Sequence, residues 1–515
     1  MSNQLIKSFL LTLLVVCILF GMFFLPRLNV GGKDWRRVNL LRDVQHRDSA
    51  GNILAEVRMD SLAGTWEIGV SASDSAENMG IAFDEIVEEE PSEETSSSPI
   101  LASTSHEASA KAESSASRSS EQHQSGKPSE QSAESSDMSV ESDSSVHVDL
   151  QPIDYSDIET GGLVPIEDFG GSMSHFRSVL QQSGSRNVRI AFFGDSFIEG
   201  DILTSDLREM LQSRYGGKGV GWLDISCVSE KFRLTARTSS SGWESHHAND
   251  KRGHQASLQG LNGAYFLCRG NATFTATGTK GRAASADKAT VLYAPGGLTL
   301  KGGVNGGAQQ ALSEENYGSL SAATIHADGI SKFSLNASGN GRVLGVALDG
   351  KTGISLDNYS MRGSNGWYTA NTTDDILSSY ARVRPYDLFV FEYGLNIANK
   401  NQTKYTFYTD KFKKVIRKIK AHFPNASILI VGSGDRDERS DNGFVTMRGV
   451  KELISAQRQM AADEGVAFWN LYAAMGGEGS IARMQQKKQA NLDYTHINAA
   501  GGKVLAKSLF DALTH

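Results

Sequence analysis

Cysteine is scarce in this chain, with 3 among 515 residues. Cys17 lies in an apolar run near the N-terminus, so Cys227 and Cys268 are the one pair available for a disulfide in an oxidising compartment. Free buried cysteines are the alternative, because unpaired thiols are common in protein interiors. The sequence leaves the state of these two thiols open.

Metal-binding motifs are missing as well. His246, His247 and His254 match no standard zinc spacing, and no cysteine is near. We interpret these histidines as part of a polar loop. We expect neither a metal ion nor any other cofactor.

Signatures of nucleotide and nucleic-acid binding are also absent. The glycines at 217, 219 and 221 are followed by no Lys-Ser/Thr pair and by no acidic residue placed for a ribose, so they do not form a phosphate loop. The net charge of -8 argues against nucleic acid as a partner. The basic cluster between Lys411 and Lys420 is interpreted as the solvated face of a helix.

An uncharged, strongly apolar run extends from Phe9 to Leu25 and has about the minimum length of a membrane span. No Ala-x-Ala cleavage site follows, which favours a retained signal-anchor or transmembrane helix over residues 1–28 rather than a cleaved signal peptide. More basic residues follow the run than precede it, so the positive-inside rule argues against an external catalytic domain.

Residues 29–150 are predicted to form an acidic, Ser-rich and largely disordered tether. Between 91 and 148 the chain is dominated by Ser, Glu, Ala and Gln and has almost no large apolar side chains. Such a segment cannot bury enough surface to offset the entropy lost on ordering. Residues 30–90 indicate no function. The remaining folded part, about 360 residues, is long enough for a doubly wound domain with an insertion.

A serine stands where a nucleophile is expected. The β-prone, mostly apolar run Val188–Phe193 leads directly into Gly194-Asp195-Ser196, and Leu203–Leu211 then has helical spacing. An α/β sheet presents a nucleophile on such a turn between strand and helix. Taken alone, Gly-Asp-Ser is more often an ordinary turn. The surrounding sequence is not Gly-x-Ser-x-Gly, which argues against the α/β-hydrolase elbow.

An acid and a base stand three residues apart near the C-terminus. Asp493 and His496 precede a predicted helix over 497–510, with Asn498 as a candidate N-cap. A serine needs a base to take its proton, and the base works best when a third group orients it. Ser196, His496 and Asp493 supply these three parts, although an isolated Asp-x-x-His is more often a polar loop or a helix cap.

A candidate oxyanion donor follows another predicted strand. Tyr386–Tyr393 is strand-like and leads into Gly394 and Asn396, whose amide is suited to donate to a developing oxyanion. An ordinary turn is the alternative. Helical and strand-like segments then alternate along the chain. Their apolar spacing predicts a helix over 405–423, a strand over 428–431, a helix over 450–464 and a strand over 466–471.

These motifs resemble the SGNH (GDSL-type) hydrolase superfamily, whose blocks are Gly-Asp-Ser, a single glycine, Gly-x-Asn and Asp-x-x-His. Three of the blocks match here in family order. The single glycine is ambiguous: Gly363 is the best candidate, Gly366 is the next, and a glycine between 216 and 221 fits the simplest members.

The resemblance implies an α/β fold over residues 151–515, with a doubly wound, flavodoxin-like parallel sheet in three layers. It implies that Ser196 is the nucleophile, His496 the base and Asp493 the residue that orients the base. The oxyanion hole would consist of the backbone N–H groups of Ser196 and Gly363 and the Asn396 amide. Asp195 is interpreted as a structural residue of the turn.

The long gap between Ser196 and Gly363 points to one subgroup. It resembles bacterial peptidoglycan O-acetylesterases and related O-acetyltransferases, which carry a β-rich insertion like a carbohydrate-binding module. Residues 224–345 fit this insertion, because short β-prone runs alternate with Gly, Asn and Ser turns and no helix is indicated. We expect an inserted antiparallel β-sandwich.

The leading hypothesis is a serine esterase that removes O-acetyl groups from a cell-envelope carbohydrate. An O-acetyltransferase with the same triad and a non-catalytic glycan-binding protein are the alternatives. The resemblance implies an acetylated glycan as substrate. With the apolar run Phe9–Leu25 as the membrane helix, we expect a single-pass protein of the bacterial inner membrane, and the resemblance implies that its catalytic domain lies in the periplasm or outside the cell. A membrane-bound acyltransferase is a possible partner under the transferase hypothesis.

Overall fold

The computed structural model describes residues 28–30, 33–35, 57–59, 66–68, 148–151, 158–250, 252–440 and 443–515. The predicted membrane segment Phe9–Leu25 and almost all of the predicted tether lie outside these ranges. In the part that is described, no helix has both the length and the apolar character to cross a membrane. Two short antiparallel pairs precede the main body: β1 (Leu28–Val30) with β2 (Lys33–Trp35), and β3 (Val57–Met59) with β4 (Trp66–Ile68).

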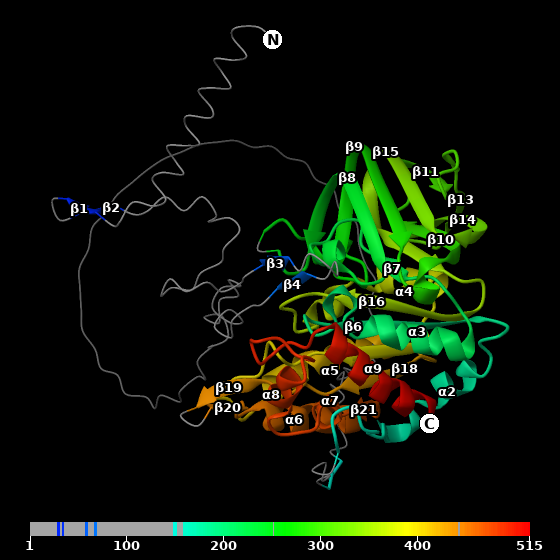
Figure 1. The fold of residues 1–515 in the computed structure, drawn as a ribbon. Helices are drawn as coiled ribbons and strands as arrows, with labels where there is room; N and C mark the ends of the chain where they lie inside the picture. Colours follow the sequence, from blue (N-terminus) through cyan, green and yellow to red (C-terminus); the bar gives the residue numbers. More distant parts are fainter. Residues whose placement is uncertain are drawn as a thin grey trace, which may run out of the picture. The chain divides into compact units, whose positions relative to one another are not determined.

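A parallel sheet forms the centre of the main body (Figure 1). Five of its strands are parallel and run in chain order 2-1-3-4-5, which is the flavodoxin-like order of a doubly wound sheet, with a short antiparallel strand at one edge. From edge to edge the strands are β16 (Gly353–Ser360), β6 (Asn187–Gly194), β17 (Leu388–Glu392), β18 (Ser427–Val431), β21 (Ala467–Trp469) and β5 (Glu167–Asp168).

Helices cover both faces of this sheet because its strands are apolar on both faces. Along β6, Ala191 and Phe193 pack into one apolar layer, whereas Ile190 and Phe192 pack into the other. The first layer is covered by α4 (Asp374–Val383), α5 (Thr406–His422) and α6 (Val450–Asp463). The second is covered by α2 (Ser174–Leu180), α3 (Thr204–Tyr215), α7 (Leu471–Met475), α8 (Ser480–Gln486) and α9 (Ala499–Thr514). The three-layer α/β prediction is confirmed.

The predicted insertion is β-structured and antiparallel. Its strands are β7 (Gly221–Leu223), β8 (Ala236–His247), β9 (Ala264–Gly278), β10 (Ala286–Tyr293), β11 (Leu298–Val304), β12 (Gln310–Ala311), β13 (Ser313–Asn316), β14 (Ser321–Ile330) and β15 (Lys332–Asp349). Within the described residues, no α-helix lies between 224 and 345. The predicted strands over 264–267 and 272–276 are parts of the single strand β9.

Hydrogen bonds join all nine strands into one sheet, which differs from the two separate sheets of the predicted sandwich. The cause is β15, a strand of 18 residues. Residues 332–343 of β15 pair with β9, and residues 343–349 pair with β10, so β15 belongs to both halves. The two halves enclose a common apolar core that includes Phe266, Phe274, Val291 and Phe333.

The glycines at 217, 219 and 221 mark the crossing between the parallel sheet and the insertion. A Cβ on Gly219 would lie 2.1 Å from the Leu348 carbonyl oxygen, and one on Gly221 would lie 2.5 Å from that of Leu356. Both residues have positive φ, at 92° and 75°. Close backbone approach therefore explains this glycine pattern.

Both described cysteines are free. Cys268 is fully buried in the core of the insertion, whereas Cys227 lies in the loop that follows β7. The disulfide that the sequence left open is not formed, because the two thiols belong to different environments.

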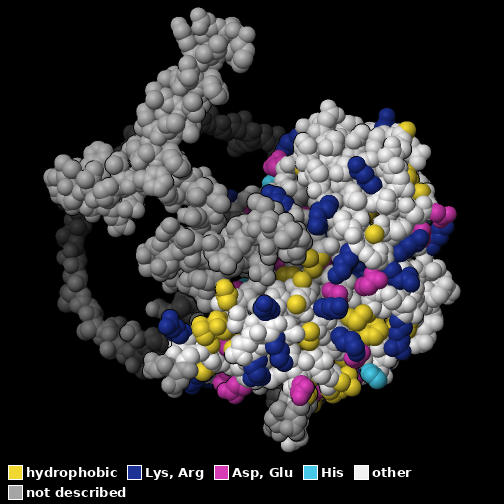
Figure 2. Space-filling view, viewed as in Figure 1, with side chains coloured by type: hydrophobic (Ala, Val, Ile, Leu, Met, Phe, Trp, Pro, Cys, Tyr) yellow, Lys and Arg dark blue, Asp and Glu magenta, His cyan; other side chains and the backbone are white. Residues whose placement is uncertain are grey.

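On the face shown in Figure 2, basic side chains are interspersed with acidic and apolar side chains. On α5, Lys413 pairs with Asp463 at 3.0 Å and Arg417 pairs with Glu464 at 2.9 Å. The Lys413 side chain is 18 % exposed and that of Arg417 is 46 % exposed, so the predicted solvated face describes only part of this cluster.

Candidate active site

Ser196 follows directly from the carboxyl end of β6, the strand beside the switch point of the parallel sheet. Ligands of open α/β sheets bind at this edge. Gly194 is the last residue of β6 and occupies a position where no side chain fits. A Cβ there would lie 2.7 Å from Ile198 Cγ1 and 2.9 Å from Glu392 Oε2. The predicted strand, turn and helix are all present, with a 3-10 turn at Glu199–Asp201 before α3.

Ser196, His496 and Asp493 form a continuous chain of hydrogen bonds. Ser196 Oγ lies 2.8 Å from His496 Nε2, and His496 Nδ1 lies 2.7 Å from Asp493 Oδ2. The Ser196 residue is 6 % exposed, and the imidazole side chain is 22 % exposed. This geometry positions the imidazole to take a proton from the hydroxyl while the carboxylate holds the opposite ring nitrogen.

The Asp-x-x-His spacing works through a local turn. Asp493 Oδ1 accepts hydrogen bonds from the backbone N–H groups of Thr495 and His496, each at 3.0 Å. The turn requires a positive φ of 52° at Tyr494. The Tyr494 ring stacks on the Phe444 ring, with 3.7 Å between the two ring centroids. A non-glycine residue in this conformation is costly, and the stacking contact holds it there.

The Asp493 carboxylate is stabilised in its charged form. Burial acts to raise its pKa, but the hydrogen bond and charge of His496, together with the two backbone N–H donors, outweigh burial and lower the pKa. Asp493 is therefore ionised at neutral pH and suited to orient an imidazole that becomes positively charged.

Asp195 is buried, and its carboxylate oxygens accept hydrogen bonds from groups other than the imidazole. Its Oδ1 accepts from the Phe197 N–H at 2.9 Å, and its Oδ2 accepts from Asn396 Nδ2 at 2.9 Å. Burial raises the pKa of Asp195 to about 6. These contacts agree with the predicted structural role of Asp195 in the turn.

Glu392 is a residue that the sequence reasoning missed. It ends β17 with no exposed surface, and no side chain among the described residues donates a hydrogen bond to its carboxyl oxygens. Burial, followed by the charge of Asp195, raises its pKa well above the ordinary value. The available signal was a single acidic residue at the end of the apolar run Leu388–Phe391.

Two of the predicted oxyanion donors are free at the carboxyl edge of the parallel sheet. Among the described residues, the N–H groups of Ser196 and Gly363 have no acceptor. Gly363 lies in the turn after β16, has a φ of 73° and is buried. Gly366, the second candidate, instead donates its N–H to Ser364 Oγ at 3.1 Å. The third group of candidates, between 216 and 221, packs against the amino end of β16 at Ile354, away from the carboxyl edge that carries Ser196.

Asn396 is positioned beside the serine turn, but its amide hydrogens are already used. Its Nδ2 donates to Asp195 Oδ2 at 2.9 Å and to the Ser364 carbonyl oxygen at 3.1 Å. In this structure, Asn396 thus joins the turn after β6 to the turn after β16. Donation to an oxyanion would require it to release or share one of these two bonds.

Residues 326–504 match the GDSL-like Lipase/Acylhydrolase family, and this range contains Gly363, Asn396, Asp493 and His496. This range begins inside the insertion and does not include Ser196. No curated protein matches the chain.

Solved structures also resemble this chain. A peptidoglycan O-acetylesterase matches with a TM-score of 0.56 and 22% identity, over 68% of this chain and 97% of that chain. An acetyl xylan esterase matches with a TM-score of 0.24 and 18% identity, over 31% and 81%. A family two carbohydrate esterase from Clostridium thermocellum matches with a TM-score of 0.23 and 12% identity, over 49% and 96%. The first of these matches supports the fold, and the predicted family resemblance is confirmed.

Proposed function

We propose that the chain is a serine esterase that removes O-acetyl groups from a cell-envelope carbohydrate, either peptidoglycan or another polysaccharide, and the match of residues 326–504 to the GDSL-like Lipase/Acylhydrolase family supports this. The observation that carries the proposal is the hydrogen-bonded chain from Ser196 through His496 to Asp493. The fold shared with a peptidoglycan O-acetylesterase supports the substrate class.

The first half of the reaction forms an acetyl-enzyme. Ser196 Oγ attacks the acetyl carbonyl carbon while His496 Nε2 takes the hydroxyl proton. The tetrahedral oxyanion accepts hydrogen bonds from the free N–H groups of Ser196 and Gly363. When the carbon–oxygen bond to the sugar breaks, His496 gives the proton to the departing sugar oxygen.

The second half releases acetate. His496 takes a proton from water, and the hydroxide oxygen attacks the acetyl carbonyl of the Ser196 ester. The same two backbone donors stabilise the second oxyanion. Collapse of this intermediate frees acetate and returns the proton to Ser196 Oγ, so that all atoms and charges balance.

We also propose where the catalytic domain is located in the cell. Residues 1–28 would anchor the chain in the bacterial inner membrane, and residues 29–150 would tether the catalytic domain in the periplasm or outside the cell. The support is the apolar run at Phe9–Leu25 together with a substrate class that lies outside that membrane.

Acetate release from O-acetylated peptidoglycan tests the proposal. The full-length protein, Ser196→Ala and the matched control Ser185→Ala, an exposed serine, are compared. We expect release by the wild type and by Ser185→Ala but none above background by Ser196→Ala. Equal release by wild type and Ser196→Ala would refute the covalent mechanism. Acetyl transfer to an added sugar acceptor, without hydrolysis, would instead identify a transferase with the same triad.

A further inference from the structure

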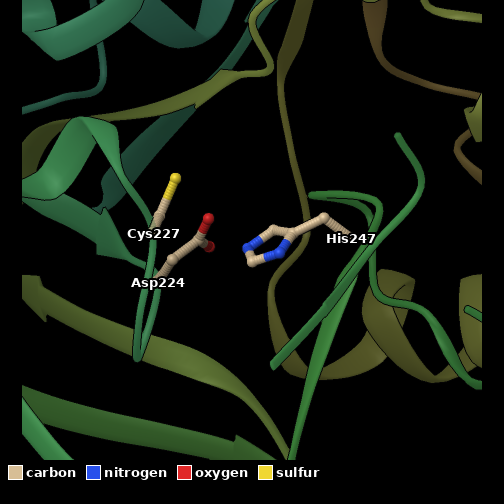
Figure 3. Close-up of side chains that lie close together, drawn as sticks. All are labelled: Asp224, Cys227 and His247. Atoms are coloured by element: carbon tan, nitrogen blue, oxygen red, sulfur yellow. The ribbon is translucent and has the colours of Figure 1, made fainter. Parts of the chain in front are cut away.

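Three potential metal ligands converge at the side of the insertion. Asp224 and Cys227 lie in the loop that follows β7, and His247 is the last residue of β8. One ligand atom from each residue lies within 4.8 Å of the other two. Figure 3 shows the imidazole pointing from its strand toward the carboxylate and the thiol. The sequence-based interpretation of His246 and His247 as part of a polar loop is wrong, because both residues belong to β8 and His247 lies close to Cys227.

The imidazole supplies an independent observation. His247 Nε2 is buried and has no hydrogen-bond partner among the described residues. The ring makes an edge contact with the Phe266 ring, with 5.7 Å between the two ring centroids. The backbone of this residue is also fixed, because the His247 N–H donates to Asp250 Oδ2 at 2.6 Å. A buried nitrogen without a partner costs free energy, and a bound cation would remove that cost.

The carboxylate is oriented in the manner of a metal ligand. Asp224 Oδ1 accepts hydrogen bonds from Trp222 Nε1 at 2.9 Å and from Asn262 Nδ2 at 2.7 Å. These two contacts fix the carboxylate, as supporting hydrogen bonds do in metal sites. Cys227 Sγ lies 3.1 Å from Ser229 Oγ, which likewise limits its rotation.

We propose that Asp224, Cys227 and His247 bind a divalent transition-metal ion, with Zn²⁺ as the best match. Zinc accepts carboxylate, thiolate and imidazole ligands together, whereas Mg²⁺ and Ca²⁺ prefer oxygen. Ligand atoms around tetrahedral zinc are roughly 3.5 Å apart, so side-chain shifts of about 1 Å would close the site. Three protein ligands leave a fourth position for water.

The bound ion would connect the loop after β7 to the end of β8, and both segments contact residues beside the proposed active site. The loop that carries Asp224 and Cys227 continues to Arg233, whose Nε donates to the buried Asp201 at 2.9 Å, five residues after Ser196. The loop after His247 reaches the other side, where Asn249 Nδ2 donates to the Arg362 carbonyl oxygen at 2.6 Å. The inferred role is structural, so it does not depend on the esterase proposal.

Cobalt titration of the chelator-treated, full-length protein tests the site. Co²⁺ bound by a thiolate gives a sulfur-to-metal charge-transfer band, which reports ligation without any activity measurement. We expect one Co²⁺ per chain, displacement by Zn²⁺, and a higher unfolding temperature with Zn²⁺. Cys227→Ser should abolish the band, whereas Cys268→Ser, the matched control for the other described thiol, should retain it.

The histidine pair provides a second comparison. His247→Ala should weaken Co²⁺ binding by at least about tenfold, because loss of a direct ligand costs no less than loss of a supporting contact. The matched control His246→Ala removes a neighbouring imidazole that contacts Glu244 instead and should bind as the wild type does. Absence of stoichiometric binding, or a band that persists unchanged in Cys227→Ser, would overturn the proposal.

Discussion

Asp493→Asn tests whether the carboxylate controls the tautomer of the base. Asp493 uses both of its oxygens: Oδ1 accepts from the N–H groups of Thr495 and His496, and Oδ2 accepts from His496 Nδ1. An asparagine that keeps its oxygen on the two backbone donors turns its NH₂ group toward Nδ1. The opposite orientation would lose two backbone hydrogen bonds, at about 1 kcal/mol each, so the first is favoured.

The favoured orientation selects the unproductive tautomer. An NH₂ group can only donate, so Nδ1 must accept and the ring proton moves to Nε2, the atom 2.8 Å from Ser196 Oγ. A protonated Nε2 cannot take the serine proton. We therefore expect kcat to fall by about 10⁴, equivalent to about 5.5 kcal/mol of activation free energy, with little change in KM.

Initial rates with 4-nitrophenyl acetate measure this loss. Ser196→Ala sets the background rate, Asp328→Asn is a control at an exposed carboxylate, and near-ultraviolet circular dichroism confirms folding. A kcat within tenfold of wild type would refute the reasoning. Asp493→Ala gives a second test, because it leaves the imidazole free to adopt either tautomer. A larger loss for Ala than for Asn, in folded variants, would also contradict the tautomer argument.

Three further predictions concern neighbouring residues. Asn396→Ala should lower both kcat and the unfolding temperature, because the substitution removes the hydrogen bond to Asp195 as well as the predicted oxyanion donor. A fall in kcat with an unchanged unfolding temperature would assign Asn396 to the oxyanion hole only. Gly363→Ala should lower kcat at least roughly tenfold, since its positive φ disfavours a side chain and a displaced N–H weakens oxyanion binding; steady-state rates at wild-type level would contradict this. Glu392→Gln should gain stability relative to wild type as pH rises above the ordinary glutamate range. The native carboxyl keeps its proton after the unfolded chain has lost it, so wild-type stability falls by up to about 1.4 kcal/mol per pH unit until the raised folded pKa is reached. Urea unfolding at pH 4 and pH 8 measures the difference, and an offset that is independent of pH would disprove the burial effect.

The sequence by itself determined the elements that depend on local patterns. The apolar run before Ser196 became β6, and helical spacing placed α5 and α6 within a residue or so of their observed bounds. Asn498 caps α9 as expected, with its Oδ1 accepting from the N–H groups of Ala500 and Gly501. Strand periodicity, helical amphipathicity and capping act over a few residues, so a sequence carries them directly.

The order of motifs also placed the candidate triad. The pairing of Asp493 with His496 is local, since one carboxylate oxygen closes the turn that presents the imidazole. The contact between Ser196 and His496 spans 300 residues and could be expected only through the family resemblance and the rule that parallel strands end at one edge. The distance of 2.8 Å between Ser196 Oγ and His496 Nε2 is given only by the tertiary structure.

Only the tertiary structure decided which polar groups share a buried environment. It committed the Asn396 amide to Asp195 and Ser364, buried Glu392 without a side-chain hydrogen-bond partner among the described residues, and brought Cys227 to His247. It also joined the insertion into a single sheet through β15. These outcomes depend on how distant segments pack and on which donors and acceptors then lose water, and no periodicity in a single segment encodes either.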